Sequence, residues 1–125
     1  MDADEVVRDF CAAWDRADLD AIMGAFTEDA VYHNIPMAPC KGKEEIRRFI
    51  GGMFAGMVKS VHFEILKQLV DGRTVMNERV DTLVMGDREV ALPVCGVFEL
   101  TADGKISAWR DYFDAAQFAG QGGDA

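Results

Sequence analysis

The sequence predicts an α+β fold in which helices cover one face of a curved sheet around an internal pocket. Two observations support this prediction. Apolar residues recur at helical spacing up to about residue 57, and from residue 59 onward they alternate with polar residues, as in half-buried strands. Four long strand candidates then follow one another with only tight turns between them, so neighbouring strands should pair antiparallel. Helices packed on one face of a strongly bent sheet form a cone, whose interior is a natural ligand pocket.

Three helices are expected in the N-terminal part of the chain. Asp18 is the expected N-cap of the second helix. The third begins near Lys43 and is weakened locally by Gly51 and Gly52. The apolar faces of the three helices comprise Val6, Val7, Phe10, Cys11 and Trp14; Leu19, Ile22, Met23 and Phe26; and Ile46, Phe49, Ile50, Met53 and Met57.

A short strand and a loop separate the second and third helices, and four longer strands follow. The stretch AVYHNI (30–35) predicts the short strand, and the prolines and glycine of PMAPCKG (36–42) predict the loop. The long strands are expected at 60–70, 74–85, 88–100 and 106–114. The turns between them are predicted by Asp71-Gly72, Gly86-Asp87 and Asp103-Gly104. The end of the chain, 115–125, is expected to form one helical turn around Phe118 and then fray.

Composition and charge narrow the class of protein. Half of the 125 residues are hydrophobic, which suits one domain (1–125) with a single sizeable core. A net charge of -9 argues against binding to nucleic acid or to anionic membranes, because both require a basic surface. The acidic start MDADEVVRDF lacks the features of a targeting peptide, and no apolar run reaches the length of a membrane span, so a cytoplasmic protein is expected. Two isolated histidines and three cysteines without CxxC spacing predict neither a metal site nor a disulfide framework.

Polar side chains fall on strand faces that are otherwise apolar. Arg79 and Asp81 lie two residues apart, so they share a face of their strand with valine, leucine and methionine side chains. Asp111 lies between two aromatic residues on its own face. Tyr32 and Asn34 share one face of the short strand. If these faces converge, the cavity contains two carboxylates, one guanidinium, one phenol and one amide within apolar walls.

Such a set supplies a base and an acid at the same pH. An arginine between two carboxylates keeps its proton, so it can hold one aspartate ionised while the other keeps a proton. The tyrosine and the asparagine can fix a water molecule beside the ionised aspartate. Opening a strained epoxide needs this combination, because a ring carbon takes water while the departing oxygen takes a proton. The residues therefore suggest hydrolysis of a hydrophobic epoxide.

Other interpretations of the same residues stay open. Arg79 and Asp81 can form an ion pair on a solvated face of the sheet. Asp111 can pair with Arg110 or Lys105 at a sheet edge. A tyrosine and an asparagine are also common where a strand runs into a proline-containing loop.

The sequence resembles the limonene epoxide hydrolase family, within the nuclear transport factor 2-like and SnoaL-like superfamily. The resemblance rests on YHN (Tyr32, Asn34), RVD (Arg79, Asp81) and WRDYF (Asp111), which match the family motif in order and approximate spacing. It implies a cone-shaped fold with three N-terminal helices packed on a curved, mixed but mostly antiparallel sheet. It also implies that Asp111 is the base, that Tyr32 and Asn34 hold the water, that Asp81 is the acid, and that Arg79 bridges the two aspartates and binds near the incoming ring oxygen.

The implied reaction is one-step hydrolysis of a small hydrophobic, cyclic or terpene-like epoxide to a vicinal diol. It needs water, no cofactor and no covalent ester of the enzyme, and family members are typically homodimers. The pocket walls, which would contact the substrate, are expected to include Met53, Met57, Leu83 and Phe113. Two alternatives on the same fold stay open: an enzyme of the ketosteroid isomerase or polyketide cyclase type, and a non-catalytic module for binding a small ligand.

Overall fold

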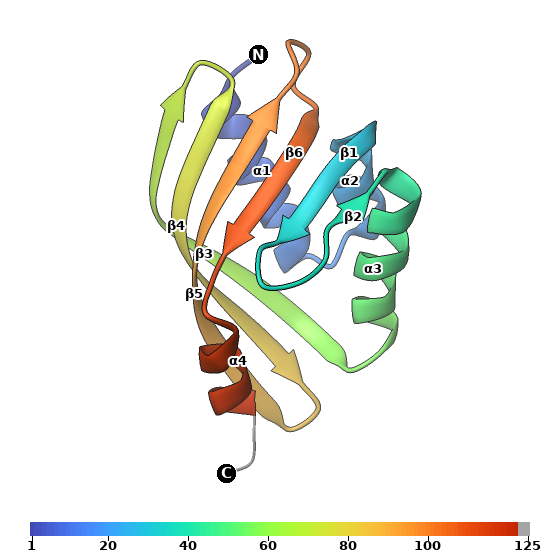
Figure 1. The fold of residues 1–125 in the computed structure, drawn as a ribbon, viewed down its shortest axis with the longest axis vertical. Helices are drawn as coiled ribbons and strands as arrows, with labels where there is room; N and C mark the ends of the chain where they lie inside the picture. The colour runs from blue at the N-terminus through green and yellow to red at the C-terminus, as the bar shows by residue number, and fades with distance from the viewer. Residues whose placement is uncertain (123–125) are drawn as a thin grey trace.

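The computed structural model describes residues 1–122, whose helices and strands form an α+β arrangement (Figure 1). The helices are α1 (Ala3–Asp15), α2 (Leu19–Gly24), α3 (Lys43–Ala55) and α4 (Ala115–Gly122). The strands are β1 (Phe26–Asn34), β2 (Cys40–Lys41), β3 (Val58–Asp71), β4 (Thr74–Met85), β5 (Arg88–Leu100) and β6 (Ile106–Tyr112). The predicted fold class is confirmed.

The strands form one mixed sheet in the order β2-β1-β6-β5-β4-β3. In the described part of the chain, β1 and β6 pair parallel and every other neighbouring pair is antiparallel. Figure 1 shows β3, β4 and β5 bending along their length, with α1 behind the sheet and α3 beside β1. The bend lets the helices and the strands enclose a common interior.

An aromatic core lies between α1 and the concave face of the sheet. Trp109 of β6 is fully buried at its centre, stacked on Tyr32 at 4.2 Å and on Phe98 at 5.3 Å between ring centroids. Phe10 of α1 meets the indole edge-on at 5.0 Å, and Trp14 does so at 5.8 Å. This packing fixes β6 against α1 and β1, and so positions the polar residues next to Trp109.

The helix starts follow the local sequence. Asp2 accepts a hydrogen bond from the backbone N–H of Glu5 at 3.2 Å, so it caps the N-terminus of α1. Asp18 accepts one from the backbone N–H of Ala21 at 3.1 Å, so it caps the N-terminus of α2. The predicted N-cap at Asp18 is therefore confirmed. The prediction that α2 extends to Phe26 is wrong: α2 ends at Gly24, and Phe26 begins β1.

Two other segments differ from the prediction. Cys40 and Lys41, expected in a loop, form β2, because they pair with Tyr32 and Val31 at the free edge of β1. The C-terminal segment forms the eight-residue helix α4 rather than one turn. The expectation that the chain end frays falls on 123–125, outside the described residues.

Candidate active site

The inner face of β4 carries the polar residues that the sequence places there. Arg79 is 0% exposed, Asp81 6% and Asn77 2%, although strands usually turn charges to solvent. Their neighbours Glu78 and Val80 lie on the opposite, outer face of the sheet. The alternative of a solvated ion pair is therefore wrong, because the concave sheet and α1 cover this face.

Arg79 joins the two aspartates through its guanidinium. Its Nε and Nη2 atoms donate to Oδ1 and Oδ2 of Asp81, both at 2.9 Å, in the bidentate geometry typical of arginine and carboxylate. Nη2 also donates to Oδ2 of Asp111 at 2.8 Å. Asp81 and Asp111 come from β4 and β6, which lie on either side of β5. One cation therefore bridges two carboxylates from strands that are not neighbours.

Asp111 has a second charge-stabilising partner. The indole Nε1–H of Trp109 donates to its Oδ1 at 2.7 Å, and the carboxylate is 3% exposed. The alternative partners of Asp111 are engaged elsewhere, since Arg110 pairs with Glu99 at 2.6 Å and Lys105 donates to the main-chain oxygen of Gly24 at 2.8 Å. Both oxygens of Asp111 are therefore oriented by fixed donors.

Burial has the largest effect on the pKa of both carboxyl groups. It raises the pKa of Asp81 and of Asp111, and the hydrogen bonds and charge of Arg79 offset only part of that rise. Burial alone would lower the pKa of Arg79, but Asp111 and Asp81 raise it well above its ordinary value. The guanidinium therefore stays charged, while at least one carboxyl group can hold a proton at a higher pH than an exposed aspartate.

Tyr32 and Asn34 approach the same place from β1. The parallel pairing of β1 with β6 aligns Asn34 with Asp111 and Tyr32 with Trp109. The phenol O–H of Tyr32 donates to Oδ1 of Asn34 at 3.4 Å. Burial, followed by the charge of Asp111, raises the pKa of Tyr32, so its hydroxyl remains a donor. The five polar residues singled out from the sequence thus lie together in the structure.

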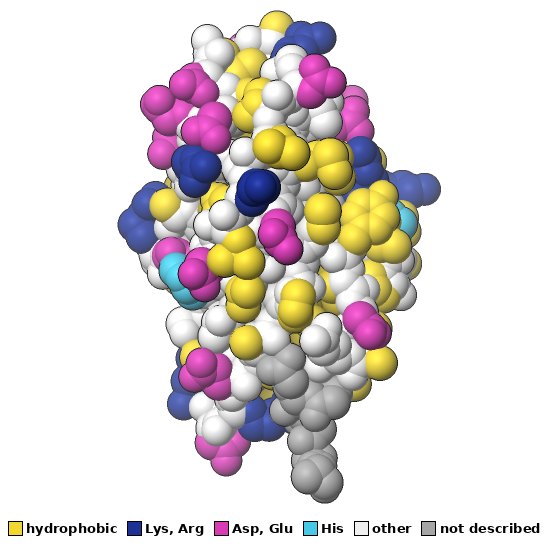
Figure 2. Space-filling view, turned by 90° about the vertical axis from the view of Figure 1, so that its left-hand side faces the viewer, with side chains coloured by type: hydrophobic (Ala, Val, Ile, Leu, Met, Phe, Trp, Pro, Cys, Tyr) yellow, Lys and Arg dark blue, Asp and Glu magenta, His cyan; other side chains and the backbone are white. Residues whose placement is uncertain are grey.

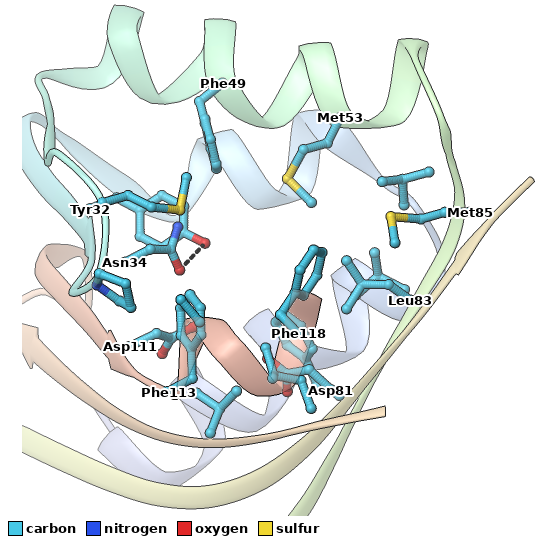
Figure 3. A pocket seen from close by; sticks show the side chains of 18 residues that line it. Tyr32, Asn34, Phe49, Met53, Asp81, Leu83, Met85, Asp111, Phe113 and Phe118 are labelled. Carbon is cyan, nitrogen blue, oxygen red and sulfur yellow. Dashed lines mark hydrogen bonds between the residues drawn. The ribbon is translucent and has the colours of Figure 1, made fainter. Parts of the chain in front are cut away.

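These residues border an apolar cavity of about 360 Å³. Figure 3 shows Tyr32, Asn34 and Asp111 on one side of it, Asp81 on another, and Phe49, Met53, Met85 and Leu83 around the rest. Phe113 and Phe118 lie between the two aspartates in this view. The cavity is lined by Tyr32, Asn34, Pro36, Met37, Phe49, Met53, Val58, Val61, Phe63, Asp81, Leu83, Met85, Leu92, Val94, Asp111, Phe113, Ala115 and Phe118.

Three of the four predicted wall residues line this cavity and one does not. Met53, Leu83 and Phe113 do, and their contact with a substrate stays a prediction. The expectation for Met57 is wrong, because its side chain is 67% exposed and outside the cavity. The reason is local: α3 ends at Ala55, so Met57 no longer follows the helical face that carries Met53.

Arg79 forms ion pairs with two residues of the cavity wall without lining the cavity itself. The guanidinium is absent from the cavity wall, because the carboxylates of Asp81 and Asp111 lie between it and the open space. Its expected contact with the surroundings of a bound ring oxygen stays a prediction. Its direct contacts include the two aspartates, the side-chain oxygen of Asn77 at 2.9 Å, and the ring of Phe63, whose centroid lies 4.7 Å from Cζ.

Sequence reasoning missed several residues of the site. Trp109 and Asn77 hold Asp111 and Arg79, and both share a strand face with them, so the period of two could have identified them. Leu92 and Val94 of β5 follow the same rule. Pro36 and Met37 in the loop after β1, and Ala115 and Phe118 of α4, carry no such signal.

Neither a metal centre nor a membrane span is found within residues 1–122. No group of three or more histidine, cysteine, aspartate or glutamate side chains in this range is arranged to hold a metal ion. Likewise, none of the described helices is both long and apolar enough to cross a membrane.

Solved structures share this architecture at widely different sequence identities. A limonene epoxide hydrolase-like epoxide hydrolase of Mycobacterium tuberculosis has a TM-score of 0.85 and 34% identity, covering 95% of this chain and 87% of that one. A putative SnoaL-like polyketide cyclase from Shewanella denitrificans also has a TM-score of 0.85, at 15% identity over 95% of each chain. A protein with a ketosteroid isomerase-like fold from Catenulispora acidiphila has a TM-score of 0.83, at 24% identity over 94% of this chain and 91% of that one. The fold is therefore of the nuclear transport factor 2-like and SnoaL-like class.

Sequence comparison separates the activities that this fold hosts. The profile of the limonene-1,2-epoxide hydrolase catalytic domain matches residues 1–121. Epoxide hydrolase EphG of Mycobacterium tuberculosis is 36% identical over 110 residues, which cover 86% of this chain and 70% of that protein. The chain belongs to the limonene-1,2-epoxide hydrolase family, and its enzyme class is epoxide hydrolase.

Proposed function

We propose that this enzyme adds water to a small hydrophobic epoxide, cyclic or terpene-like, and forms a vicinal diol in one step without a cofactor. The observation that carries the proposal is that two buried carboxylates, Asp81 and Asp111, line one apolar cavity and share a single guanidinium. The charge of Arg79 stabilises one ionised carboxylate, whereas burial and the repulsion of a second negative charge favour a proton on the other. An acid and a base are then present together.

Asp111 is the base in this mechanism. Its two oxygens are oriented by Arg79 and Trp109, and Asn34 is its register partner on β1. A water molecule beside Asp111 can donate one hydrogen to the carboxylate and the other to the Tyr32 oxygen, whose own hydrogen is donated to Asn34, and it can accept a hydrogen bond from the Asn34 amide nitrogen. Asp111 then takes a proton from this water while the water oxygen attacks a ring carbon.

Asp81 is the acid. As the new carbon–oxygen bond forms, the ring carbon–oxygen bond breaks, and Asp81 gives its proton to the departing oxygen. The products are a diol, a protonated Asp111 and an ionised Asp81. The cycle closes when the proton passes back from Asp111 to Asp81.

The walls of the cavity favour a small apolar substrate. Apart from Tyr32, Asn34 and the two aspartates, its lining consists of aliphatic, methionine, proline and phenylalanine side chains. Its volume of about 360 Å³ lies near the lower end of the usual range for small-molecule sites.

We also propose that the enzyme is a homodimer. The outer face of the sheet supports this, because it exposes Leu69, Met76, Cys95 and Tyr112 on neighbouring strands. A second copy of the chain would cover these apolar side chains.

Hydrolysis in water labelled with oxygen-18 tests the mechanism. Wild type, Asp111→Asn and Tyr32→Phe are incubated with a panel of cyclic and terpene epoxides, and the diol is analysed by mass spectrometry. We expect wild type to form diol, Asp111→Asn to form essentially none, and Tyr32→Phe to react more slowly by about ten- to a hundredfold. Asp87→Asn is the matched control, because Asp87 is an exposed aspartate in the turn between β4 and β5.

Single-turnover conditions identify the nucleophile. If water attacks the ring directly, the first diol formed carries the label. Unlabelled diol in the first turnover would instead place an enzyme carboxylate as the nucleophile. A folded wild type that hydrolyses no epoxide, or an Asp111→Asn variant with full activity, would contradict the proposal.

A further inference from the structure

A chain of two side-chain amides extends from Arg79 in the direction away from the cavity. Nη1 of Arg79 donates to Oδ1 of Asn77 at 2.9 Å, and Nδ2 of Asn77 donates to Oε1 of Gln68 on β3 at 3.0 Å. Nε2 of Gln68 donates to the main-chain oxygen of Asp4 at 3.1 Å and to its Oδ1 at 2.9 Å. The chain therefore joins the buried guanidinium to the first turn of α1.

The chemistry of its two ends fixes the direction of every hydrogen bond in this chain. Arg79 can only donate, so the oxygen of Asn77 must face it and the nitrogen must face Gln68. The carboxylate and carbonyl of Asp4 can only accept, so Gln68 must present its nitrogen to Asp4 and its oxygen to Asn77. Neither amide can rotate by half a turn without bringing two donors or two acceptors together.

Asn77 differs from the other partners of Arg79 in its charge. Asp81 and Asp111 hold the Nε and Nη2 side of the guanidinium, and both change protonation during the proposed reaction. Asn77 holds the Nη1 side and stays neutral throughout. It is 2% exposed and lies outside the cavity lining, so it touches no substrate.

We propose that Asn77 is a positioning residue for the reaction, that it acts through Arg79, and that Gln68 fixes its orientation. Asn77 keeps the guanidinium plane in place while the two aspartates exchange their proton states. The relative positions of the base and the acid are then preserved through the cycle. The inference rests on the proposed function.

Asn77→Leu removes the amide while keeping the number and branching of the side-chain heavy atoms. We expect kcat to fall by about ten- to a hundredfold, because a displacement of roughly 1 Å at a catalytic group can cost on the order of a hundredfold in rate. KM should change little, because the cavity wall is untouched. Gln68→Met should lower kcat by a smaller factor, since Asn77 keeps its contact with Arg79 but loses the partner that orients it.

The pH profile separates positioning from a general loss of structure. Asn77→Asp keeps an oxygen beside Arg79 but adds a third carboxylate to its surroundings. The titratable groups that already face the cluster are Cys11 from α1, Tyr32 from β1, and Asp81 and Asp111. On β3, His62 also acts on Asp81, but it is exposed and contacts Asp15. A further negative charge disfavours ionisation of Asp111, so the acid limb of kcat should move to higher pH by about one unit. Asn77→Leu should leave this limb nearly unchanged.

A measurement on the free enzyme adds a readout that does not depend on turnover. Restrained rotation about the bonds to Nη1 and Nη2 makes the guanidinium N–H signals separately visible by ¹⁵N NMR. In wild type we expect resolved Arg79 Nη signals, and in Asn77→Leu we expect the Nη1 signals to broaden or merge. Arg8→Ala is the control, because Arg8 donates to both oxygens of the exposed Asp4 carboxylate and its removal leaves Gln68 and Asn77 with their own partners; both its kcat and its Arg79 signals should match wild type.

The outcomes distinguish this inference from the proposed function. If wild type hydrolyses epoxides and folded Asn77→Leu has wild-type kcat and NMR signals, the positioning role is wrong and the mechanism stands. A loss of kcat that only follows the unfolded fraction, with no pH shift in Asn77→Asp, also contradicts it. A wild type that hydrolyses no epoxide contradicts the proposed function, whereas the Arg79 NMR signals still test the hydrogen-bonded chain.

Discussion

The absence of a side chain at Gly96 makes room for the buried ion cluster. Gly96 lies on β5 between its register partners Asn77 on β4 and Asp111 on β6. A Cβ atom there would lie 2.8 Å from Oδ1 of Asp111 and 3.0 Å from Oδ1 of Asn77, and still closer to Nη1 of Arg79. Even a methyl group would therefore displace the atoms that hold the two aspartates.

We expect Gly96→Ala to lower kcat by at least about a hundredfold and to destabilise the fold by roughly 1–3 kcal/mol, because it overpacks a filled site. Steady-state kinetics and urea denaturation measure the two effects. Gly52→Ala is the matched control: Gly52 lies in α3 with open space where a Cβ would be, so alanine should stabilise by about 0.5–1 kcal/mol. Wild-type kinetics for Gly96→Ala would show that the cluster tolerates displacement.

The two buried aspartates also link stability to pH. Burial is the main reason that the pKa of each lies above its ordinary value of 3.8. A carboxyl group with a higher pKa in the folded than in the unfolded chain binds its proton more strongly when folded. Its contribution to stability is therefore fully present at pH values below 3.8, and it is lost as pH rises through the raised folded pKa.

Asp111→Asn removes one such group and relieves Asp81 of a negative neighbour. We expect the free energy of unfolding of wild type, minus that of the variant, to decrease as pH rises from 3.8 toward neutrality. The change should be about 1.4 kcal/mol for each unit by which the folded pKa exceeds the unfolded one. Urea denaturation at a series of pH values measures it, and a difference that grows with pH would show that Arg79 outweighs burial.

At the scale of elements, the end of α3 decides which methionine belongs to the site. α3 closes at Ala55 with Gly56 as its C-cap, and β3 begins at Val58. Met53 on the last turn reaches the cavity, whereas Met57 lies in the connection and is 67% exposed.

Alanine substitution at these two methionines tests the assignment. Met53→Ala removes apolar contact worth about 1–2 kcal/mol, so KM for a hydrophobic epoxide should rise by about five- to thirtyfold. Met57→Ala should leave KM unchanged. Steady-state kinetics on the best substrate of the panel measure both, and equal effects of the two variants would mean that α3 ends differently when substrate is bound.

At the scale of the whole molecule, the two faces of the sheet have different surroundings. The concave face packs against α1 and contains the cavity, whereas Leu69 and Met76, paired across β3 and β4, are 64% and 45% exposed on the outer face. Figure 2 shows hydrophobic side chains gathered along the middle of one side of the molecule, with charged side chains between and around them. Such a surface is typical of a protein that associates.

The homodimer proposal predicts that a charge among the exposed apolar side chains of this face weakens association. In a two-fold dimer, Met76→Asp would bring one carboxylate from each subunit into the interface. The dimer Kd should therefore rise by at least about thirtyfold. Analytical ultracentrifugation over a range of concentrations measures it. Met57→Asp is the matched control at another exposed methionine and should not change Kd. A wild type that stays monomeric at all concentrations would contradict the proposal.

Much of this architecture could be predicted from the sequence, because local patterns of apolar and turn residues indicate where the strands begin and end. The predicted strands 74–85 and 88–100 match the observed bounds of β4 and β5, since tight turns delimit a clear period of two. On β6 the period fails at one point: Ile106 and Trp109 are both fully buried, because a bulge shifts the register between Glu99 and Leu100 of the partner strand. The sequence contains no local signal for that bulge.

The site was predictable to a similar extent. The spacing of two residues predicts that Arg79 and Asp81 lie on the same face of their strand. The order of the YHN, RVD and WRDYF motifs indicates the family. Asn77 and Trp109 were on the same faces, yet their roles depend on hydrogen bonds to side chains that only packing brings within reach. Phe118 and Met37 enter the cavity wall through a helix and a loop whose positions no periodicity specifies.

By itself, the sequence determined which residue types face inward, because alternation along a strand is a local property of the backbone. It did not determine that β1 lies parallel to β6, which sets Asn34 beside Asp111, or that Arg79 bridges aspartates from β4 and β6. Those contacts join residues up to 77 positions apart, in the case of Asn34 and Asp111. They are decided by how the aromatic core around Trp109 fixes α1, β1 and the sheet together, which is a balance of packing over the whole fold.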